Sequence, residues 1–329
     1  MAPKVLLYEN IPADLYVHLE QNCDLNYLES LQSASRSDLQ TLLAKAEGMI
    51  GVKDKIGSEI LDLAPNLKVI STISVGYDKF DVADLTRRKI MLMHTPDVLT
   101  ETTADTIFML ILCAARRATE LNNMVREGRW RDDIGADYFG TDVHGKKLGI
   151  LGMGRIGSAV AKRAHAGFNM EILYYSRSVN QRVEKDFMAQ RFSLHHVLAE
   201  SDFVCVTLPL TEQTRKLIGA KELALMKPGA FLINGGRGPI IDETALIEAL
   251  QQGIIKGAGL DVYEQEPLSG DSPLVDMANV VTLPHIGSAT HETRYAMAQC
   301  AVNNLLAALN ERTSVNCVNP EVINRGSSS

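Results

Sequence analysis

The segment KLGILGMGRIGSAVAKRA constrains the fold of this chain more than any other stretch. An apolar run typical of a β-strand leads directly into Gly152, Gly154 and Gly157, and a helical pattern follows. In this G-x-G-x-x-G spacing the first glycine permits a tight turn, and the second lets the backbone approach a pyrophosphate. The third lets the helix pack closely on the strand. The segment therefore predicts the first βα unit of a dinucleotide-binding domain.

Two further groups of residues are expected to face the cofactor. Arg155 and Ile156 open the helix, whose free N–H groups and positive dipole end favour phosphates. In such domains an acidic residue about 20 positions further on usually binds the adenine ribose. Here the next strand, MEILYY, ends in Ser176, Arg177 and Ser178 instead. A serine and an arginine donate hydrogen bonds to a 2′-phosphate, which an acid would repel, so the loop favours NADPH and predicts weaker use of NADH. The alternative is that Arg177 is only a solvated loop cation.

Short apolar segments alternate with helical patterns along most of the chain, which predicts βα units and parallel sheets. One set of strands is predicted at 4–9, 46–51, 67–74 and 90–96. A long helical stretch, 100–128, separates it from a second set at 147–152, 170–176, 202–209, 230–236, 257–262 and 280–287. A last helix is predicted at 292–310. With 329 residues, the chain is expected to form two domains.

Composition excludes several classes of protein. The net charge of −7 and the lack of a Lys/Arg cluster argue against a nucleic-acid partner. No apolar run reaches the roughly 18 residues of a membrane span, and the N-terminus runs into a strand without the pattern of a signal peptide. The five cysteines form no CxxC pair, which argues against zinc and disulfides and predicts a reducing cytoplasm. No metal site is expected.

Charged residues follow three strands of the second set. Arg237 comes after 230–236, Asp261 and Glu266 come with or after 257–262, and His285 lies at the end of 280–287. Ligands of open α/β sheets bind at the carboxyl ends of the strands, so these side chains are candidates for one site.

The residue types suit reduction of a 2-keto acid. A histidine can protonate the carbonyl oxygen near neutral pH, and a neighbouring carboxylate favours the charged ring and fixes its orientation. An arginine can bind the substrate carboxylate and polarise the carbonyl. Taken singly, each residue also has an ordinary explanation: His285 as a strand-end histidine, and Arg237 with Glu266 as a surface ion pair of little energetic value.

Several segments together resemble one family. LGMGRIG, INGGRGPIIDE, GLDVYEQEP and PHIGSATHETR are similar, in order, to signature segments of the D-isomer-specific 2-hydroxyacid dehydrogenases. STISVGYDKFD and HTPDVLTETTADT extend the likeness, so that it covers the chain from about residue 3 to 320. Within the family, the chain resembles bacterial reductases of glyoxylate and hydroxypyruvate that are also described as 2-ketogluconate reductases.

The resemblance implies roles for particular residues. Arg237 matches the family's substrate-binding arginine, His285 its proton donor, which also contacts substrate, and Glu266 the carboxylate that partners the histidine. Val75 and Gly76 match a loop whose backbone N–H groups hold the substrate carboxylate. The positions that match the cofactor cleft, Asp261 among them at the nicotinamide carboxamide, are Thr103, Pro209, Asp261 and Gly287.

The resemblance also implies an architecture. It predicts two doubly wound parallel-sheet domains of the α/β class, a Rossmann dinucleotide domain (99–289) inserted into a flavodoxin-like substrate domain (1–98 with 290–329). A cleft and hinge are expected near 98–101 and 286–291, and a homodimer is expected through the helix at about 101–126. Trp130 either reaches the neighbouring subunit's pocket or only packs.

The implied activity is reduction of a small 2-keto acid by NADPH. Which acid is preferred stays open, because the tail of the substrate beyond C2 has no recognisable signature. A non-enzymatic corepressor of the same fold, regulated by NAD(H), is the alternative, since such proteins keep the same arginine, glutamate and histidine. The missing ribose acid argues against it.

Overall fold

The computed structural model describes residues 2–52, 54–311 and 315–324. The chain forms two compact units, unit 1 (Met1–Leu99 with Ala289–Ser329) and unit 2 (Thr100–Ser288). These limits differ by one residue from the domain limits expected from sequence. Within the described ranges, no helix is long and apolar enough to cross a membrane.

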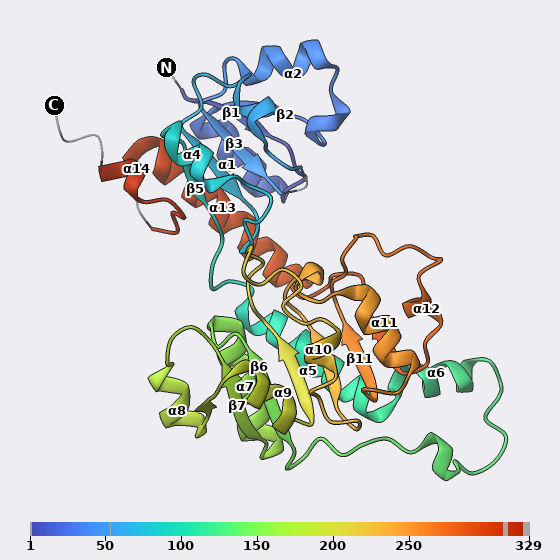
Figure 1. Ribbon diagram of the computed structural model, residues 1–329. Helices are drawn as coiled ribbons and strands as arrows, with labels where there is room; N and C mark the ends of the chain where they lie inside the picture. Colours follow the sequence, from blue (N-terminus) through green and yellow to red (C-terminus); the bar gives the residue numbers. More distant parts are fainter. Residues whose placement is uncertain (1, 53, 312–314, 325–329) are drawn as a thin grey trace. The chain divides into compact units, whose positions relative to one another are not determined.

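Unit 2 is built on a seven-stranded parallel sheet with the order β12-β11-β10-β9-β6-β7-β8. Figure 1 labels β6, β7 and β11 of this sheet. Read from β8, this is the strand order of a dinucleotide-binding fold with one strand added at the far edge. The strands are β6 (Lys147–Leu151), β7 (Glu171–Tyr175), β8 (Gln190–Arg191), β9 (Phe203–Val206), β10 (Phe231–Asn234), β11 (Gly257–Leu260) and β12 (Val280–Thr282).

Helices cover both faces of this sheet. Successive side chains of a strand point to opposite faces, and apolar side chains on both faces are buried. Leu148, Ile150 and Cys205 pack in one core with α5 and α7. Leu151 and Val204 pack in a separate core with α9–α11. The helices are α5 (Thr100–Arg116), α7 (Arg155–Phe168), α6 (Ala118–Arg126), α8 (Gln181–Phe187), α9 (Leu194–Glu200), α10 (Ala220–Leu223), α11 (Glu243–Gln251) and α12 (Pro273–Asp276), with single turns η2 (Ala136–Tyr138) and η3 (Gly238–Ile240).

Unit 1 contains a five-stranded parallel sheet with the order β2-β1-β3-β4-β5. The order 2-1-3-4-5 is that of flavodoxin-like folds, so the expected fold class is confirmed for both units. The strands are β1 (Lys4–Leu7), β2 (Asp24–Tyr27), β3 (Gly48–Gly51), β4 (Val69–Thr72) and β5 (Met91–Met93). The helices are α1 (Ala13–Asn22), α2 (Arg36–Leu43), α3 (Ser58–Leu61), α4 (Val82–Arg87), α13 (His291–Glu311) and α14 (Glu321–Asn324), with one turn at η1 (Leu31–Ser33).

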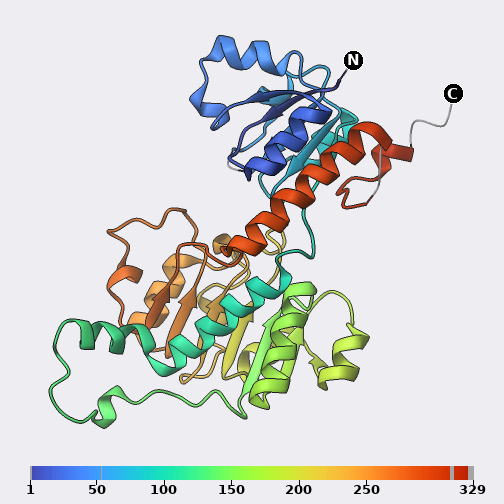
Figure 2. The same ribbon diagram turned by 180° about the vertical axis from the view of Figure 1, so that it is seen from behind.

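The long helix α13 completes unit 1. It packs against β3, β4 and β5 and beside α1, and it is drawn in red in Figure 2. Ser71 Oγ on β4 donates a hydrogen bond of 2.8 Å to the carbonyl of Ala301. A Cβ on Gly48 of β3 would lie 3.0 Å from Leu305 Cδ1, so the glycine allows close packing between helix and strand. The final segment of the chain therefore covers a sheet built by the first segment.

One expected element is interrupted. The helical stretch predicted at 100–128 is two helices, α5 and α6, because Arg117 adopts a left-handed backbone with φ of +54°. This conformation costs an L-residue roughly 1–2 kcal/mol. The Arg117 guanidinium offsets it with two hydrogen bonds of 2.7 Å to Glu120 and a position 5.4 Å above the ring of Tyr138.

Candidate active site

The three glycines of the fingerprint occupy the turn between β6 and α7 and have different surroundings. Gly152 has φ of +107°, and a Cβ there would lie 2.9 Å from the backbone of Thr207 and Leu208. A Cβ on Gly157 would lie 2.1 Å from the carbonyl oxygen of Gly152, so no side chain fits there. A Cβ on Gly154 would meet no atom within 4 Å. The open space above Gly154, at the N-terminus of α7, suits a pyrophosphate, and Arg155 and Ile156 form the first turn of that helix.

The loop that follows β7 is tied to the glycine turn. Arg177 and Ser178 are exposed, and Ser176 Oγ donates to the carbonyl of Ser178. Asn180 Nδ2 donates to the carbonyl of Met153, between the first two glycines, at 3.1 Å. The serine–arginine–serine loop therefore lies beside the turn expected to hold the pyrophosphate, where an adenine ribose would come.

Arg191 was not predicted from sequence to belong to this region. Its Nε donates to the carbonyl of Ser176 at 2.9 Å, and its Nη2 donates to the carbonyl of Arg177 at 3.1 Å. Arg191 ends β8, a strand of two residues that lies outside the strands predicted above. Its only signal in the sequence is a basic residue 14 positions after Arg177.

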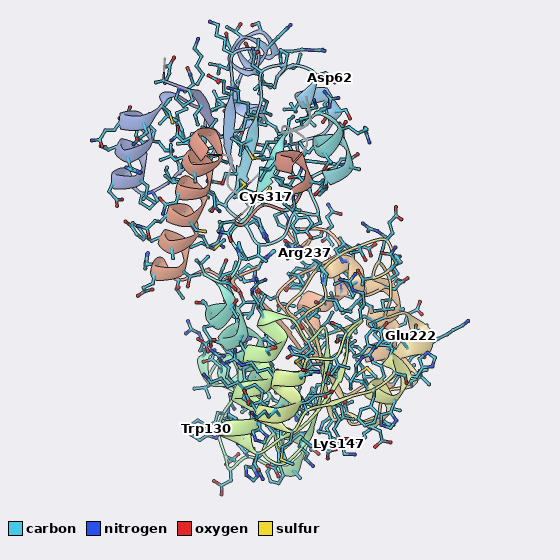
Figure 3. All side chains as sticks on the ribbon, turned by 90° about the vertical axis from the view of Figure 1, so that its left-hand side faces the viewer. Asp62, Trp130, Lys147, Glu222, Arg237 and Cys317 are labelled. Atoms are coloured by element: carbon cyan, nitrogen blue, oxygen red, sulfur yellow. The ribbon has the colours of Figure 1, made fainter. Side chains whose placement is uncertain are left out.

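The strand-end residues of unit 2 meet at the carboxyl edge of its sheet. Figure 3 shows Arg237 at one end of unit 2 and Lys147, the first residue of β6, at the other. His285 Nδ1 lies 2.7 Å from Glu266 Oε2. The charge of Arg237 acts on Glu266, and Arg237 Nη1 donates to the carbonyl of Gly236 at 3.0 Å. The arginine, glutamate and histidine thus lie in one site.

The surroundings of Glu266 keep its carboxyl group ionised. Burial disfavours the ionised carboxyl, but the hydrogen bond and charge of His285, the N–H of Tyr263 and the charge of Arg237 together lower its pKa below the usual value. A carboxylate only accepts hydrogen bonds, so Nδ1 of His285 carries the proton in this contact. The second ring nitrogen, Nε2, is left to donate or accept elsewhere.

Asp261 holds the backbone behind the histidine. His285 has φ of +53°, a left-handed conformation. Asp261 accepts the N–H of Ile286 at 2.7 Å through Oδ1 and the N–H of Gly287 at 2.8 Å through Oδ2. Burial raises the pKa of this carboxyl, and the two N–H groups act against that rise. Asp261 therefore stabilises the unusual turn that presents His285, a role not expected from sequence.

Tyr263 connects the segments that carry Arg237, Glu266 and His285. Its backbone N–H donates to Glu266 Oε1 at 3.1 Å, and its hydroxyl lies 2.9 Å from the carbonyl of Leu283, two residues before His285. A Cβ on Gly238 would lie 1.8 Å from the carbonyl group of Tyr263, so the glycine after Arg237 permits the loops to touch. Burial raises the pKa of the Tyr263 hydroxyl to about 12, so it stays protonated and donates.

The remaining expected cofactor residues are divided along the same edge. Thr103 lies buried on α5, and its Oγ1 is 3.6 Å from the position a Cβ would take on Gly287. Pro209 follows β9, and its carbonyl accepts the hydroxyl of Thr214 at 2.7 Å. Thr103, Gly287 and Asp261 are therefore neighbours, while Pro209 extends from a different strand.

Val75 and Gly76 belong to unit 1, where they follow β4. His94 Nδ1 lies 3.0 Å from the carbonyl of Val75, and the rings of His94 and Tyr77 make an edge-to-face contact at 5.8 Å. Asn304 of α13 donates to the carbonyl of His94 at 2.8 Å. The loop is therefore held by contacts within its own unit.

Across the described ranges of both units, no group of three or more His, Cys, Asp or Glu side chains could hold a metal ion.

Comparison with known proteins identifies the family. The model of the D-isomer specific 2-hydroxyacid dehydrogenase NAD-binding domain matches residues 108–287. The glyoxylate/hydroxypyruvate reductase B of Yersinia enterocolitica is 57% identical over 98% of this chain and 99% of that protein. The chain belongs to the D-isomer specific 2-hydroxyacid dehydrogenase family. The resemblance inferred from the signature segments is confirmed.

Solved structures of similar proteins have the same fold. The TT0316 protein of Thermus thermophilus is 40% identical, with a TM-score of 0.86 over 95% of this chain and 99% of that one. An NADPH-dependent glyoxylate/hydroxypyruvate reductase of Sinorhizobium meliloti, solved with NADP and malonate, is 31% identical, with a TM-score of 0.85 over 97% of this chain and 98% of that one.

Proposed function

We propose that this family member reduces small 2-keto acids, glyoxylate and hydroxypyruvate among them, to D-2-hydroxy acids with NADPH. The observation that carries the proposal is the 2.7 Å pair of His285 and Glu266, with Arg237 beside it, on the sheet edge that also carries the glycine turn. The Yersinia and Sinorhizobium relatives are glyoxylate/hydroxypyruvate reductases, which points to the same substrates.

The proposed reaction gives His285, Glu266 and Arg237 different roles. NADPH, when bound, supplies the hydride that adds to C2 of the keto acid. Protonated His285 donates its Nε2 proton to the carbonyl oxygen, which becomes the hydroxyl of the product. Glu266 keeps Nδ1 protonated and stabilises the charged ring before the proton leaves. Arg237 binds the carboxylate of the substrate and stabilises negative charge that develops on the carbonyl oxygen. On the resemblance of SVGYD, we assign Val75 and Gly76 to the substrate carboxylate.

The residues present fit NADPH better than NADH. The space above Gly154 and the N–H groups of α7 suit the pyrophosphate. The loop positions 176–178 are Ser176, Arg177 and Ser178, so they carry no carboxylate that would repel a 2′-phosphate. We assign Thr103, Pro209, Asp261 and Gly287 to the nicotinamide half. Weaker use of NADH is expected, because only the contacts to the 2′-phosphate are lost.

The deciding experiment follows NADPH oxidation by the purified protein with glyoxylate, hydroxypyruvate and 2-ketogluconate. We expect turnover with at least one acid, and a His285→Gln variant should lose about 10²–10⁴-fold in kcat while it still binds NADPH. A variant that retains more than about a tenth of the wild-type rate would remove His285 from the mechanism. Binding of dinucleotide without turnover of any 2-keto acid would favour a corepressor-like binding protein instead.

We further propose a cytoplasmic homodimer. All five cysteines are free thiols, which suits a reducing compartment. The segment from α5 to the loop after α6 carries several exposed apolar side chains, with exposed fractions of 39% at Met109, 53% at Val125 and 62% at Phe139. Trp130, at the periphery of unit 2 in Figure 3, is 60% exposed and lies in the same segment. Such a surface on one protomer suits a partner protomer.

A further inference from the structure

Arg191 is placed by strand pairing next to the loop expected to read the cofactor's ribose. It lies opposite Tyr174 in the parallel register of β7 and β8. From there its guanidinium reaches past the end of β7 and donates to two consecutive carbonyls, of Ser176 at 2.9 Å and of Arg177 at 3.1 Å. One planar guanidinium therefore spans the first two peptide carbonyls of the loop.

These two hydrogen bonds change the electrostatics of the loop. A peptide carbonyl oxygen carries partial negative charge and repels a phosphate that approaches it. The guanidinium covers both oxygens and adds a full positive charge beside Arg177, within an exposed loop. The loop thereby presents its donors, and a second cation, to an anion.

The remainder of the loop is fixed by other contacts. Asn180 N–H donates to the Tyr174 hydroxyl at 3.0 Å, and Asn180 Nδ2 donates to the carbonyl of Met153 at 3.1 Å. Loss of Arg191 would therefore release residues 176–177 while the glycine turn and the start of α8 stay in place. An effect confined to the 2′-position of the ribose is the expected signature.

We propose that Arg191 is a positioning residue for the cofactor's 2′-phosphate: its paired hydrogen bonds hold the Ser176–Arg177 backbone in the conformation that binds the phosphate. This inference rests on the proposed use of NADPH. It adds a residue from a different strand to the serine–arginine–serine loop and makes the choice between NADPH and NADH depend on the β7–β8 pairing.

The test compares ligands that differ only by the 2′-phosphate. For Arg191→Met, we expect the KM for NADPH to rise about tenfold, which corresponds to about 1.4 kcal/mol, and the KM for NADH to change less than about twofold. Adenosine 2′,5′-bisphosphate, used as an inhibitor, should weaken by the same factor, whereas AMP should not weaken. Arg191→Lys should recover only part of the loss, because an ammonium does not reproduce the fork of two N–H donors.

A matched control is Arg182→Met, which removes an exposed cation of α8 whose partner is Asp186 at 3.5 Å. It should leave all four ligands unchanged. Equal losses for NADPH and NADH in Arg191→Met would overturn the inference, as would full recovery by lysine or an equal effect of the control. If the wild-type protein itself does not distinguish adenosine 2′,5′-bisphosphate from AMP, the proposed NADPH preference fails first, and that result needs no variant.

Discussion

The ring of His285 and the backbone behind it are held by different carboxylates. Glu266 bonds the ring at 2.7 Å, and Asp261 bonds the N–H groups of the two following residues. Because the two contacts fix different atoms, the imidazole has one orientation, with Nε2 directed away from Glu266. Pre-organisation of this kind lowers the entropy that catalysis would otherwise lose on ordering the ring.

The contact between Glu266 and His285 predicts a pH-dependent contribution to stability. The folded state lowers the pKa of Glu266, so its stabilisation is present above the unfolded pKa of about 4.3 and is lost as pH falls through the folded value. At pH near 7, Glu266→Gln should destabilise the protein by about 1 kcal/mol. Thermal unfolding midpoints of variant and wild type should converge as pH falls below about 4. A Glu264→Gln control, two residues away on an exposed carboxylate, should show a smaller difference, and a gap for Glu266→Gln that is constant with pH would contradict the assignment.

Arg177 gives a test of cofactor choice that is independent of Arg191. The Arg177→Asp substitution places a carboxylate next to the expected position of the ribose. There it would accept hydrogen bonds from a 2′-hydroxyl and repel a 2′-phosphate. We expect kcat/KM for NADPH to fall at least about tenfold more than kcat/KM for NADH. Steady-state kinetics with both cofactors measure the ratio. Equal losses would mean that Arg177 is a solvated loop cation without a role in the choice.

Sequence alone predicted those site residues that lie beside a strand in the chain. Arg237, Glu266 and His285 each follow an apolar run, so the rule of carboxyl strand ends made them candidates for one site. The bonds of Asp261 to residues 25 and 26 positions later, and of Arg191 to the loop before β8, depend on the folded sheet. No local pattern encodes such contacts. The structural roles of Asp261 and Arg191 were therefore not predicted from sequence.

At the level of elements, the glycine turn between β6 and α7 separates fold from function. Gly157 packs against the carbonyl of Gly152, whereas Gly154 faces open space. Gly157→Ala should destabilise unit 2 by about 1–3 kcal/mol through the backbone clash. Gly154→Ala, at a compatible φ of −82°, should change stability by less than about 1 kcal/mol but weaken NADPH binding, because its methyl group enters the space assigned to the pyrophosphate. Thermal unfolding and NADPH titration of both variants measure the two effects; an unchanged affinity in Gly154→Ala would contradict the assignment.

Elements with weak apolar patterns were the ones that sequence missed. β2, DLNY, is short, and two of its four residues are exposed, as befits a strand at the edge of its sheet. β8 has two residues, both exposed. The break between α5 and α6 was missed because arginine is an ordinary helix residue, and the left-handed turn at Arg117 depends on Glu120 and Tyr138. Strands buried on both faces were predicted to within a few residues.

At the scale of the whole molecule, the exposed apolar segment predicts association. A stable interface buries roughly 800 Å² on each partner, and a charge placed at its centre is costly to desolvate. We expect the wild-type protein to be a dimer and Phe139→Asp with Val125→Glu to shift it toward monomer, as measured by light scattering after size exclusion. Val275→Glu, at an exposed valine of α12, is the matched control. A monomeric wild type, or a dimer insensitive to the double substitution, would contradict the proposed interface.

The packing of α13 on β3, β4 and β5 has a consequence for how the chain is made. The ribosome releases the five strands of unit 1 early, but the helix that covers them is translated only after all of unit 2. Unit 2 is contiguous and can fold as soon as residue 288 has emerged. Until α13 has emerged as well, the face of the first sheet that this helix covers stays exposed to solvent. Unit 2 can therefore complete its fold before unit 1 does, although the chain begins with unit 1.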